Sequence, residues 1–166
     1  MIIRNEKKSD IDVISEVTIE AFKNCPHGNH TEQFIISALR AANALAISLV
    51  AEIEGKVVGH IAFSPVTISG RSCDWYGLGP VSVLPGFQKQ GIGKSLINKG
   101  LNLLKASGAK GCVLVGDPGY YERFGFRNIP ELILEGVPKE NFLALPFGEN
   151  KTHGVVVFHE GFNAEG

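Results

Sequence analysis

The chain has 166 residues, of which 44% are hydrophobic and 20% are charged, and its formal net charge at pH 7 is -1. This length and composition favour one compact domain with a substantial hydrophobic core, so we expect a single domain from residue 1 to residue 166. The near-zero charge and the lack of a basic stripe argue against nucleic acid or an anionic membrane as the partner.

The cysteines and the apolar stretches exclude further classes of protein. Cys25, Cys73 and Cys112 are odd in number and far apart, which matches neither a disulfide framework nor a CxxC metal site. The start MIIRNEKKSD is too polar for a signal peptide, and the longest apolar-rich stretch, residues 41–53, is shorter than a membrane span. We therefore expect a cytoplasmic protein with reduced thiols and no bound metal.

The first half of the chain has a strand-like start, two helical patterns and then β-rich runs. Apolar residues recur at helical spacing in the two helical patterns, and Glu54-Gly55 is short enough to join two strands as a hairpin. The expected elements are a strand at residues 1–4, helices at 11–22 and after Thr31, and strands at 46–55, 56–70 and 73–85. These strands predict an antiparallel meander.

The second half begins with an amphipathic helix from Gly91 to about Ser107. Its apolar residues share one face, and Gly108 is placed to end it. After it come a strand at residues 111–116, a short helical turn or loop at 117–124, and closing strands at 141–147 and 154–162. The order predicts an α/β fold with a mixed, mostly antiparallel central sheet flanked by helices.

The stretch QKQGIGKS, residues 88–95, ends in the Gly-Lys-Ser of a nucleotide-binding P-loop. A P-loop needs a glycine where Gln88 stands and a series of βα units after the motif, so the sequence disfavours a nucleoside triphosphate site. Asp117 follows an apolar strand, as a metal-binding aspartate would. A glycine-rich turn before a helix can also cradle another anion, or it can be a tight turn with no ligand.

Two motifs together resemble the GNAT superfamily of acyl-CoA-dependent N-acyltransferases. Residues 88–93, QKQGIG, match the signature [QR]-x-x-G-x-[GA], and the preceding VSVLPGF resembles the strand before it. Residues 121–126, YERFGF, match the second signature, Y-x-x-x-G-F. Residues 2–22 also look like the family's first strand and helix, so the resemblance covers most of the chain. It is closest to a group of small, mostly uncharacterised bacterial acetyltransferases.

The resemblance implies a sheet whose fourth and fifth strands splay apart and a site for acetyl-CoA. The pyrophosphate would lie on the backbone before the helix, and Val83 would bind the acetyl carbonyl. An amine would then attack the thioester directly in a ternary complex, and Tyr121 would protonate the CoA thiolate, with Tyr120 as a neighbour that packs or substitutes. The implied acetyl-CoA-binding residues are Val81, Ser82, Val83, Gln88, Lys89, Gln90, Gly91, Ile92, Gly93, Lys94 and Ser95.

The chain departs from the family pattern at two places. The turn GDPGYY is shorter than usual and has Asp117 and Pro118 where many members have an asparagine. Gly77 stands near the position at which many members carry a glutamate that acts as general base. The other candidate bases are His60, Asp74, Glu20 and Glu32.

The spacing of His27 and His30 could suit a metal, but no third ligand is placed nearby, which favours a polar loop over the acceptor cleft.

The sequence does not identify the acceptor, which could be a small-molecule or peptide amine. The last strand, GVVVF, could pair across a homodimer. Two other functions remain: a catalytically silent CoA-binding regulatory protein on the same fold, and a nucleotide hydrolase.

Overall fold

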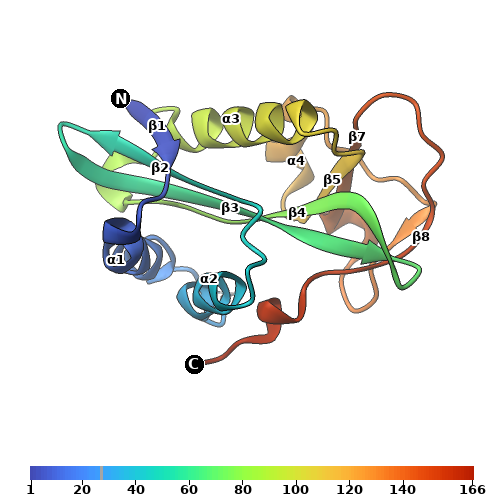
Figure 1. Cartoon of the computed structure of the whole chain (residues 1–166), viewed down its shortest axis with the longest axis horizontal. Helices are drawn as coiled ribbons and strands as arrows, with labels where there is room; N and C mark the ends of the chain where they lie inside the picture. The colour runs from blue at the N-terminus through green and yellow to red at the C-terminus, as the bar shows by residue number, and fades with distance from the viewer. Residues whose placement is uncertain (27) are drawn as a thin grey trace. The chain divides into compact units, whose positions relative to one another are not determined.

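The computed structural model describes residues 1–26 and 28–166. Its principal elements in chain order are β1 (Ile2–Asn5), α1 (Ile11–Phe22), α2 (Glu32–Ala41), β2 (Ile47–Ile53), β3 (Lys56–Ile68), β4 (Arg71–Val83), α3 (Ile92–Ala106), β5 (Gly111–Val115), α4 (Pro118–Tyr121), β6 (Leu132–Ile133), β7 (Phe142–Pro146) and β8 (Gly154–Val157) (Figure 1). Among the described residues, every helix is too short or too polar to span a bilayer.

The chain divides into two compact units. The first unit is Met1–Phe63, Gly79–Gly100 and Glu160–Gly166, and the second is Ser64–Leu78 and Leu101–His159. The strands β3 and β4 and the helix α3 therefore contribute residues to both. The expectation of a single domain over residues 1–166 stays a prediction.

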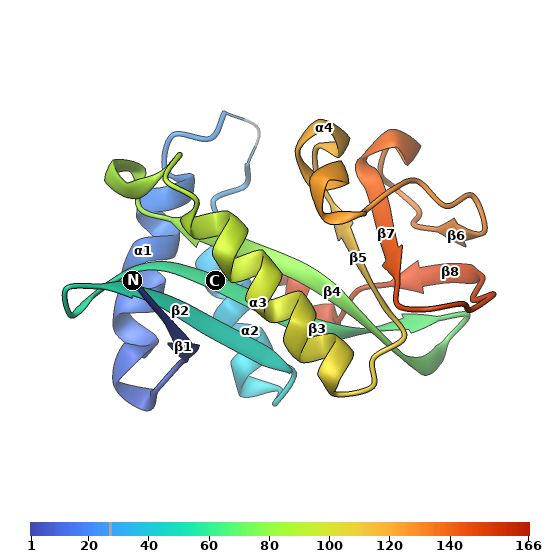
Figure 2. The ribbon, with the colours of Figure 1, turned by 90° about the horizontal axis from the view of Figure 1, so that it is seen from above.

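In the first unit, β1, β2, β3 and β4 follow one another across the sheet, with β2 antiparallel to both β1 and β3. Glu54 (φ 49°) and Gly55 (φ 79°) form the turn between β2 and β3, and two left-handed residues are what a tight hairpin requires. The helices α1 and α2 cover one face of this sheet, and the first half of α3 covers the other (Figures 1 and 2). Val50 of β2 packs with Ile14, Val17 and Ile36 on the α1 and α2 side.

Glycines let α3 lie close to the opposite face. A Cβ at Gly59 of β3 would lie 3.2 Å from the side chains of both Ile92 and Leu96. A Cβ at Gly100 of α3 would lie only 2.2 Å from the ring of Phe63. The close packing of α3 on β3 therefore depends on residues without side chains at these two positions.

In the second unit, β5 lies between β4 and β7 (Figure 2). The pairing of β5 with β7 is antiparallel over its whole length, whereas the parallel pairing of β4 with β5 covers only Trp75–Gly77 and Gly111–Val113. The register with β5 thus ends at Gly77, although β4 continues to Val83. The predicted fold class, a mixed and mostly antiparallel sheet flanked by helices with separating fourth and fifth strands, is confirmed.

The end of the chain differs from the prediction. The closing strand is shorter, because β8 ends at Val157 and residues 160–163 form a 3-10 helix. The two-residue strand β6 was not predicted, since so short a strand has no readable periodicity. One side of β8 pairs with β3 and the other with β6. A homodimer through this strand would have to replace bonds made within the chain, and the oligomeric state stays a prediction.

Candidate functional site

The turn between β4 and α3 carries the glycine-rich motif. After a 3-10 turn at Pro85–Phe87, the backbone takes left-handed conformations at Lys89 (φ 62°) and Gly91 (φ 86°). A lysine rarely adopts such a φ, so its surroundings must hold it there. A Cβ at Gly91 would have nothing within 4 Å, which leaves the backbone open to a ligand at this point.

The N-terminus of α3 follows directly. The amide of Ser95 donates to the carbonyl of Gly91 at 3.0 Å, as the first bond of the helix. The amides of Ile92, Gly93 and Lys94 precede it and have no carbonyl four residues back within the helix. Together with the helix dipole, these amides form a region of partial positive charge that favours an anion.

The end of β4 presents backbone groups on two edges. The carbonyl of Ser82 faces β3, because a Cβ at Gly59 would lie 3.2 Å from its oxygen. Backbone groups of neighbouring strand residues point to opposite edges, so those of Val81 and Val83 face away from β3. On that edge Nε2 of Gln88 donates to the carbonyl of Val83 at 3.0 Å. Gln88 therefore ties the start of the motif to the end of β4.

The first unit thus contains every residue that the sequence proposed for acetyl-CoA binding. One of them, Ser82, turns its side chain inward: it is 2% exposed, and its Oγ has no hydrogen-bond partner among the described residues.

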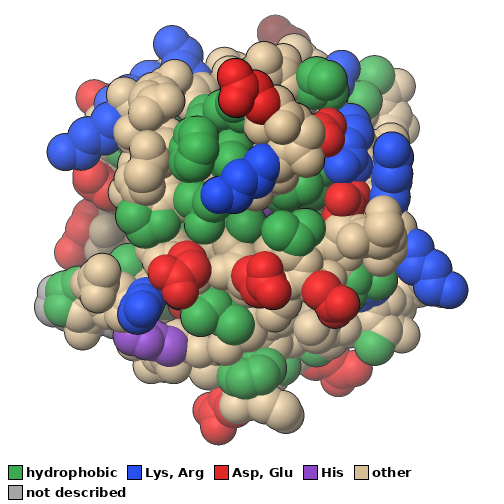
Figure 3. All heavy atoms as spheres, turned by 90° about the vertical axis from the view of Figure 1, so that its left-hand side faces the viewer, with side chains coloured by type: hydrophobic (Ala, Val, Ile, Leu, Met, Phe, Trp, Pro, Cys, Tyr) green, Lys and Arg blue, Asp and Glu red, His purple; other side chains and the backbone are tan. Residues whose placement is uncertain are grey.

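On the face that Figure 3 shows, hydrophobic side chains gather above a row of acidic ones, with Lys and Arg side chains around them. A surface with both charge signs favours a local anion site over a polyanion-binding patch.

Tyr121, the proposed acid, belongs to the second unit. It ends α4, whose N-cap Asp117 accepts a hydrogen bond from the backbone two residues on. The ring of Tyr121 lies against Gly116, where a Cβ would be only 2.6 Å from it, and its centroid is 6.1 Å from that of Phe126. Burial, with a smaller contribution from Tyr120, raises the pKa of Tyr121 to about 12. Its hydroxyl therefore stays protonated at neutral pH.

Gly77 stands near the position at which the resemblance implies a glutamate, and its surroundings are crowded. The ring of Phe158 packs directly on it, and a Cβ at Gly77 would lie 2.7 Å from that ring and 3.3 Å from Val66. No carboxylate fits at this position while Phe158 stays where it is. The ring of Phe158 therefore occupies the space that a side chain at Gly77 would need.

His60, a candidate base, is part of a buried polar cluster in the first unit. Its Nε2 lies 2.8 Å from Oγ of Ser48, and Ser48 also donates to Glu6. Burial lowers the pKa of His60 to about 4, despite the opposing charge of Glu6. Burial opposes ionisation of Glu6 too, but hydrogen bonds from Arg40 and Ser48 outweigh it and hold its pKa below the usual value. This cluster joins elements of the fold, and we do not assign His60 as the base.

The remaining candidates do not form a common site. Glu20 and Asp74 are exposed, and Oε1 of Glu32 is buried without a partner among the described residues. His27 lies outside the described residues, and the ring of His30 is 3.1 Å from the carbonyl of Cys25. Over residues 1–26 and 28–166, no group of three His, Cys, Asp or Glu side chains could hold a metal ion.

Two features of the structure could not be read from the sequence. The first is the Glu6, Arg40 and Ser48 cluster, whose members are far apart in sequence and carry no motif. The second is a cavity in the second unit formed by residues 128–142. The sequence does contain a run of apolar residues at this place, interrupted by Pro130 and Gly136. That run has neither helical nor strand spacing, so it predicted no element.

Comparison with known proteins decides the family. The model of the acetyltransferase (GNAT) domain matches residues 44–128. Over 127 residues, the chain is 35% identical to the uncharacterized N-acetyltransferase YhbS of Escherichia coli K12, covering 76% of this chain and 73% of YhbS. The chain belongs to the GNAT acetyltransferase family. This acetyltransferase is also 36% identical over 123 residues to YjhQ of the same organism, covering 72% of this chain and 65% of YjhQ.

Two solved structures resemble this GNAT acetyltransferase over nearly its whole length. A GNAT family acetyltransferase from Brucella melitensis, in complex with acetyl-CoA, is 49% identical, with a TM-score of 0.87 and 97% of each chain covered. E. coli YhbS, in complex with CoA, is 30% identical, with a TM-score of 0.90, and the match covers 99% of this chain and 93% of YhbS. The likeness therefore includes both the fold and a substantial share of the sequence.

Proposed function

We propose that this GNAT acetyltransferase moves an acetyl group from acetyl-CoA to an amine by direct attack in a ternary complex. The observation that carries the proposal is the Brucella acetyltransferase, which is 49% identical over 97% of both chains and was crystallised with acetyl-CoA. The open turn before α3 supports it from this chain's own residues, because it offers free amides and a glycine without neighbours to an anionic group.

The residues before and at the start of α3 suit the pyrophosphate of acetyl-CoA. The amides of Ile92, Gly93 and Lys94 would bind its oxygens, and Lys89 and Lys94 would add positive charge. The backbone of Val81 and Val83, on the edge of β4 away from β3, would bond the amides of the pantetheine arm. In this assignment the side chain of Gln88 holds the end of β4 in place through its bond to Val83.

The transfer step needs an oxyanion donor and an acid. The amine nitrogen forms a bond to the thioester carbonyl carbon, and the N–H of Val83 stabilises the oxygen that becomes negative. The carbon–sulfur bond then breaks, and the hydroxyl of Tyr121 donates its proton to the departing thiolate. The extra proton on the amine leaves through water to restore Tyr121, so the products are the N-acetyl amine and CoA. In this proposal water carries away the amine proton, because Phe158 excludes a carboxylate at Gly77.

The test is thiol release from acetyl-CoA in the presence of a panel of amines, with reactions lacking amine or enzyme as controls. We expect release that depends on at least one amine, together with the matching N-acetyl product by mass spectrometry. Calorimetric binding of acetyl-CoA without transfer to any amine would instead favour the silent CoA-binding protein. No binding of acetyl-CoA at all would refute both.

A further inference from the structure

A loop of the second unit, residues 128–142, is closed at its base by hydrogen bonds. Nδ2 of Asn128 donates to the carbonyls of Lys139 and Phe142, both at 3.0 Å. Compact surface loops whose ends meet in this way are often functional. The shape of this loop is therefore held by the chain's own bonds before any ligand arrives.

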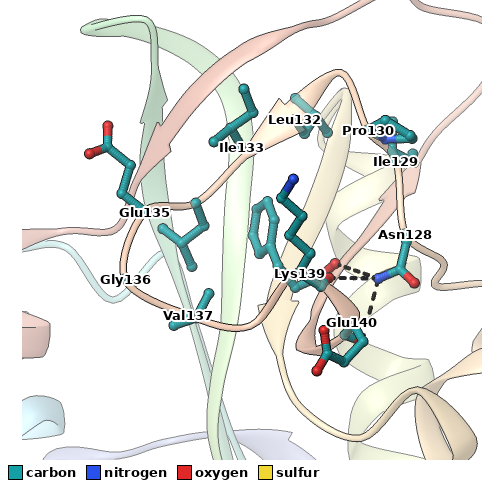
Figure 4. A pocket seen from close by; sticks show the side chains of 12 residues that line it. Asn128, Ile129, Pro130, Leu132, Ile133, Glu135, Gly136, Val137, Lys139 and Glu140 are labelled. Carbon is teal, nitrogen blue, oxygen red and sulfur yellow. Dashed lines mark hydrogen bonds between the residues drawn. The ribbon is translucent and has the colours of Figure 1, made fainter.

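The loop encloses a cavity of about 770 Å³ (Figure 4). Leu132 and Phe142, which line it, are buried members of the core of this unit, and Leu134 and Val137 pack against that core. Ile133 also lines the cavity but is 50% exposed. Both the volume and the apolar lining are those of a preformed small-molecule site.

One end of the cavity lies beside the turn that carries the proposed acid. Asn141 follows the cavity residue Glu140, and its carbonyl accepts from the amide of Gly116 at 2.9 Å. Nδ2 of Asn141 donates back to the carbonyl of Gly116 at 3.1 Å. Gly116 is also the residue on which the Tyr121 ring rests. The segment that lines the cavity is thus joined, through Asn141, to the residue on which the ring of the proposed acid packs.

Three charged side chains line the cavity. Lys139 extends across it toward Ile133, and Glu135 and Glu140 lie at different ends of it (Figure 4). The ion pairs found among the described residues do not include any of the three. All three are exposed, so a ligand on the apolar lining can meet the positive group of Lys139 at the surface and the negative group of Glu140 at the end nearest Gly116.

We propose that this cavity binds the acetyl acceptor, and that the acceptor is an amino carboxylic acid with an apolar body. The carboxylate of the acceptor pairs with Lys139, the apolar body lies on Ile133 and Val137, and the amine lies at the end marked by Glu140. This assignment rests on the proposed acetyl transfer, because it places the acceptor of that same reaction.

The experiment compares phenylalanine with phenethylamine, which keeps the amine and ring but lacks the carboxylate. We expect the wild-type enzyme to prefer phenylalanine by at least about tenfold in kcat/KM, as a charge-assisted contact to a ligand predicts. Lys139→Met should remove that preference, leave kcat/KM for phenethylamine within about twofold, and leave the calorimetric affinity for acetyl-CoA unchanged. Lys110→Met, an exposed lysine outside the cavity, is the matched control and should retain the preference.

A second variant tests the apolar wall. Ile133→Asp should lower kcat/KM for both substrates by at least about tenfold, because it places a charge where the apolar body lies. Ile133 is half-exposed, so we expect the variant to fold, with circular dichroism as the check. Val157→Asp, at a similarly exposed residue of β8 outside the cavity, should retain activity.

Several results would overturn the acceptor assignment. Equal use of both substrates by the wild-type enzyme, or equal loss for both in Lys139→Met, would refute the role of Lys139. Acetylation only of other amines, such as spermidine or a peptide lysine, with no effect of either cavity variant, would refute the cavity while the proposed transfer stands. Binding of acetyl-CoA without transfer to any amine would refute the proposed function, and the acceptor assignment with it.

Discussion

At the scale of single residues, burial decides what Tyr121 and His60 can do. Burial raises the pKa of Tyr121 to about 12 and lowers that of His60 to about 4, and in both cases the neutral form is the one favoured. A neutral tyrosine can donate a proton to a thiolate, whereas a histidine with so low a pKa is a weak base. The same physical effect thus supports one proposed role and argues against the other.

Replacing Tyr121 with phenylalanine tests the acid. We expect Tyr121→Phe to lower kcat at neutral pH by about 10²-fold or more, because the thiolate would have to take its proton from water. The affinity for acetyl-CoA, measured by calorimetry, should change little, since the ring that packs on Gly116 is retained. Tyr120→Phe is the matched control, and a wild-type kcat in Tyr121→Phe would remove Tyr121 from the mechanism.

The low pKa of His60 predicts a pH dependence of stability. As pH falls from about 6.5 to about 4, the unfolded chain binds a proton at this histidine that the folded chain does not. The free energy of unfolding should therefore fall across this range, by at most about 3 kcal/mol from this group. Urea unfolding of the wild type and of His60→Gln measures it, and the variant should lose less stability over the same range. Parallel curves would contradict the burial effect.

At the scale of elements, the turn before α3 and the packing of α3 on β3 depend on glycine for different reasons. Gly91 has a left-handed φ and open surroundings, so it leaves room for a ligand. Gly100 has an ordinary helical conformation, and the ring of Phe63 packs against it, so the missing side chain leaves room for that ring. Substitution should affect binding at the first position and stability at the second.

Gly91→Glu should weaken acetyl-CoA binding. A carboxylate placed on the proposed pyrophosphate site should raise the calorimetric Kd by at least about tenfold. Gly91→Ala controls for backbone strain, which costs roughly 1–2 kcal/mol in a left-handed residue, and should weaken binding much less. The assignment of the pyrophosphate site to this turn fails if Gly91→Glu folds, as judged by circular dichroism, and binds acetyl-CoA like the wild type.

Gly100→Ala separates helix propensity from packing. Propensity alone predicts that alanine stabilises α3 by about 1 kcal/mol. The added Cβ would lie 2.2 Å from the Phe63 ring, so we expect a net loss of about 1–3 kcal/mol in urea unfolding. Gly86→Ala is the control, because a Cβ there has nothing within 4 Å. An unchanged or higher stability in Gly100→Ala would show that the ring moves aside freely.

At the scale of the whole molecule, we propose that residues 1–166 fold as one domain although two compact units can be distinguished. The reason is that β3, β4 and α3 run through both units, so neither unit can lose these elements alone. Cooperative unfolding as a single transition follows from shared elements of this kind.

The single tryptophan allows that proposal to be tested. Trp75 is 1% exposed and belongs to the second unit, whereas α1 and α2 belong to the first. Urea transitions followed by Trp75 fluorescence and by far-ultraviolet circular dichroism should therefore coincide. Two separate midpoints would show that the units unfold independently and would refute the single domain.

Local patterns predicted most of the elements. Apolar spacing identified α1, α2 and α3, and Glu54-Gly55 placed the turn between β2 and β3, because each depends on residues close in sequence. The two-residue strand β6 and the early end of β8 were not predicted, since both depend on pairing with distant strands. The cluster of Glu6, Arg40 and Ser48 was missed for the same reason, because its members are far apart in the sequence.

From the sequence alone, the resemblance of residues 88–93 and 121–126 to two family motifs indicated the family, the glycine turn before α3 and Tyr121, because each motif is a short stretch of chain. Only the tertiary structure showed that Phe158 takes the place of a carboxylate at Gly77, and that His60 is buried. It also revealed the cavity of residues 128–142. Each of these depends on side chains from distant parts of the chain competing for the same space, which spacing along one chain does not record.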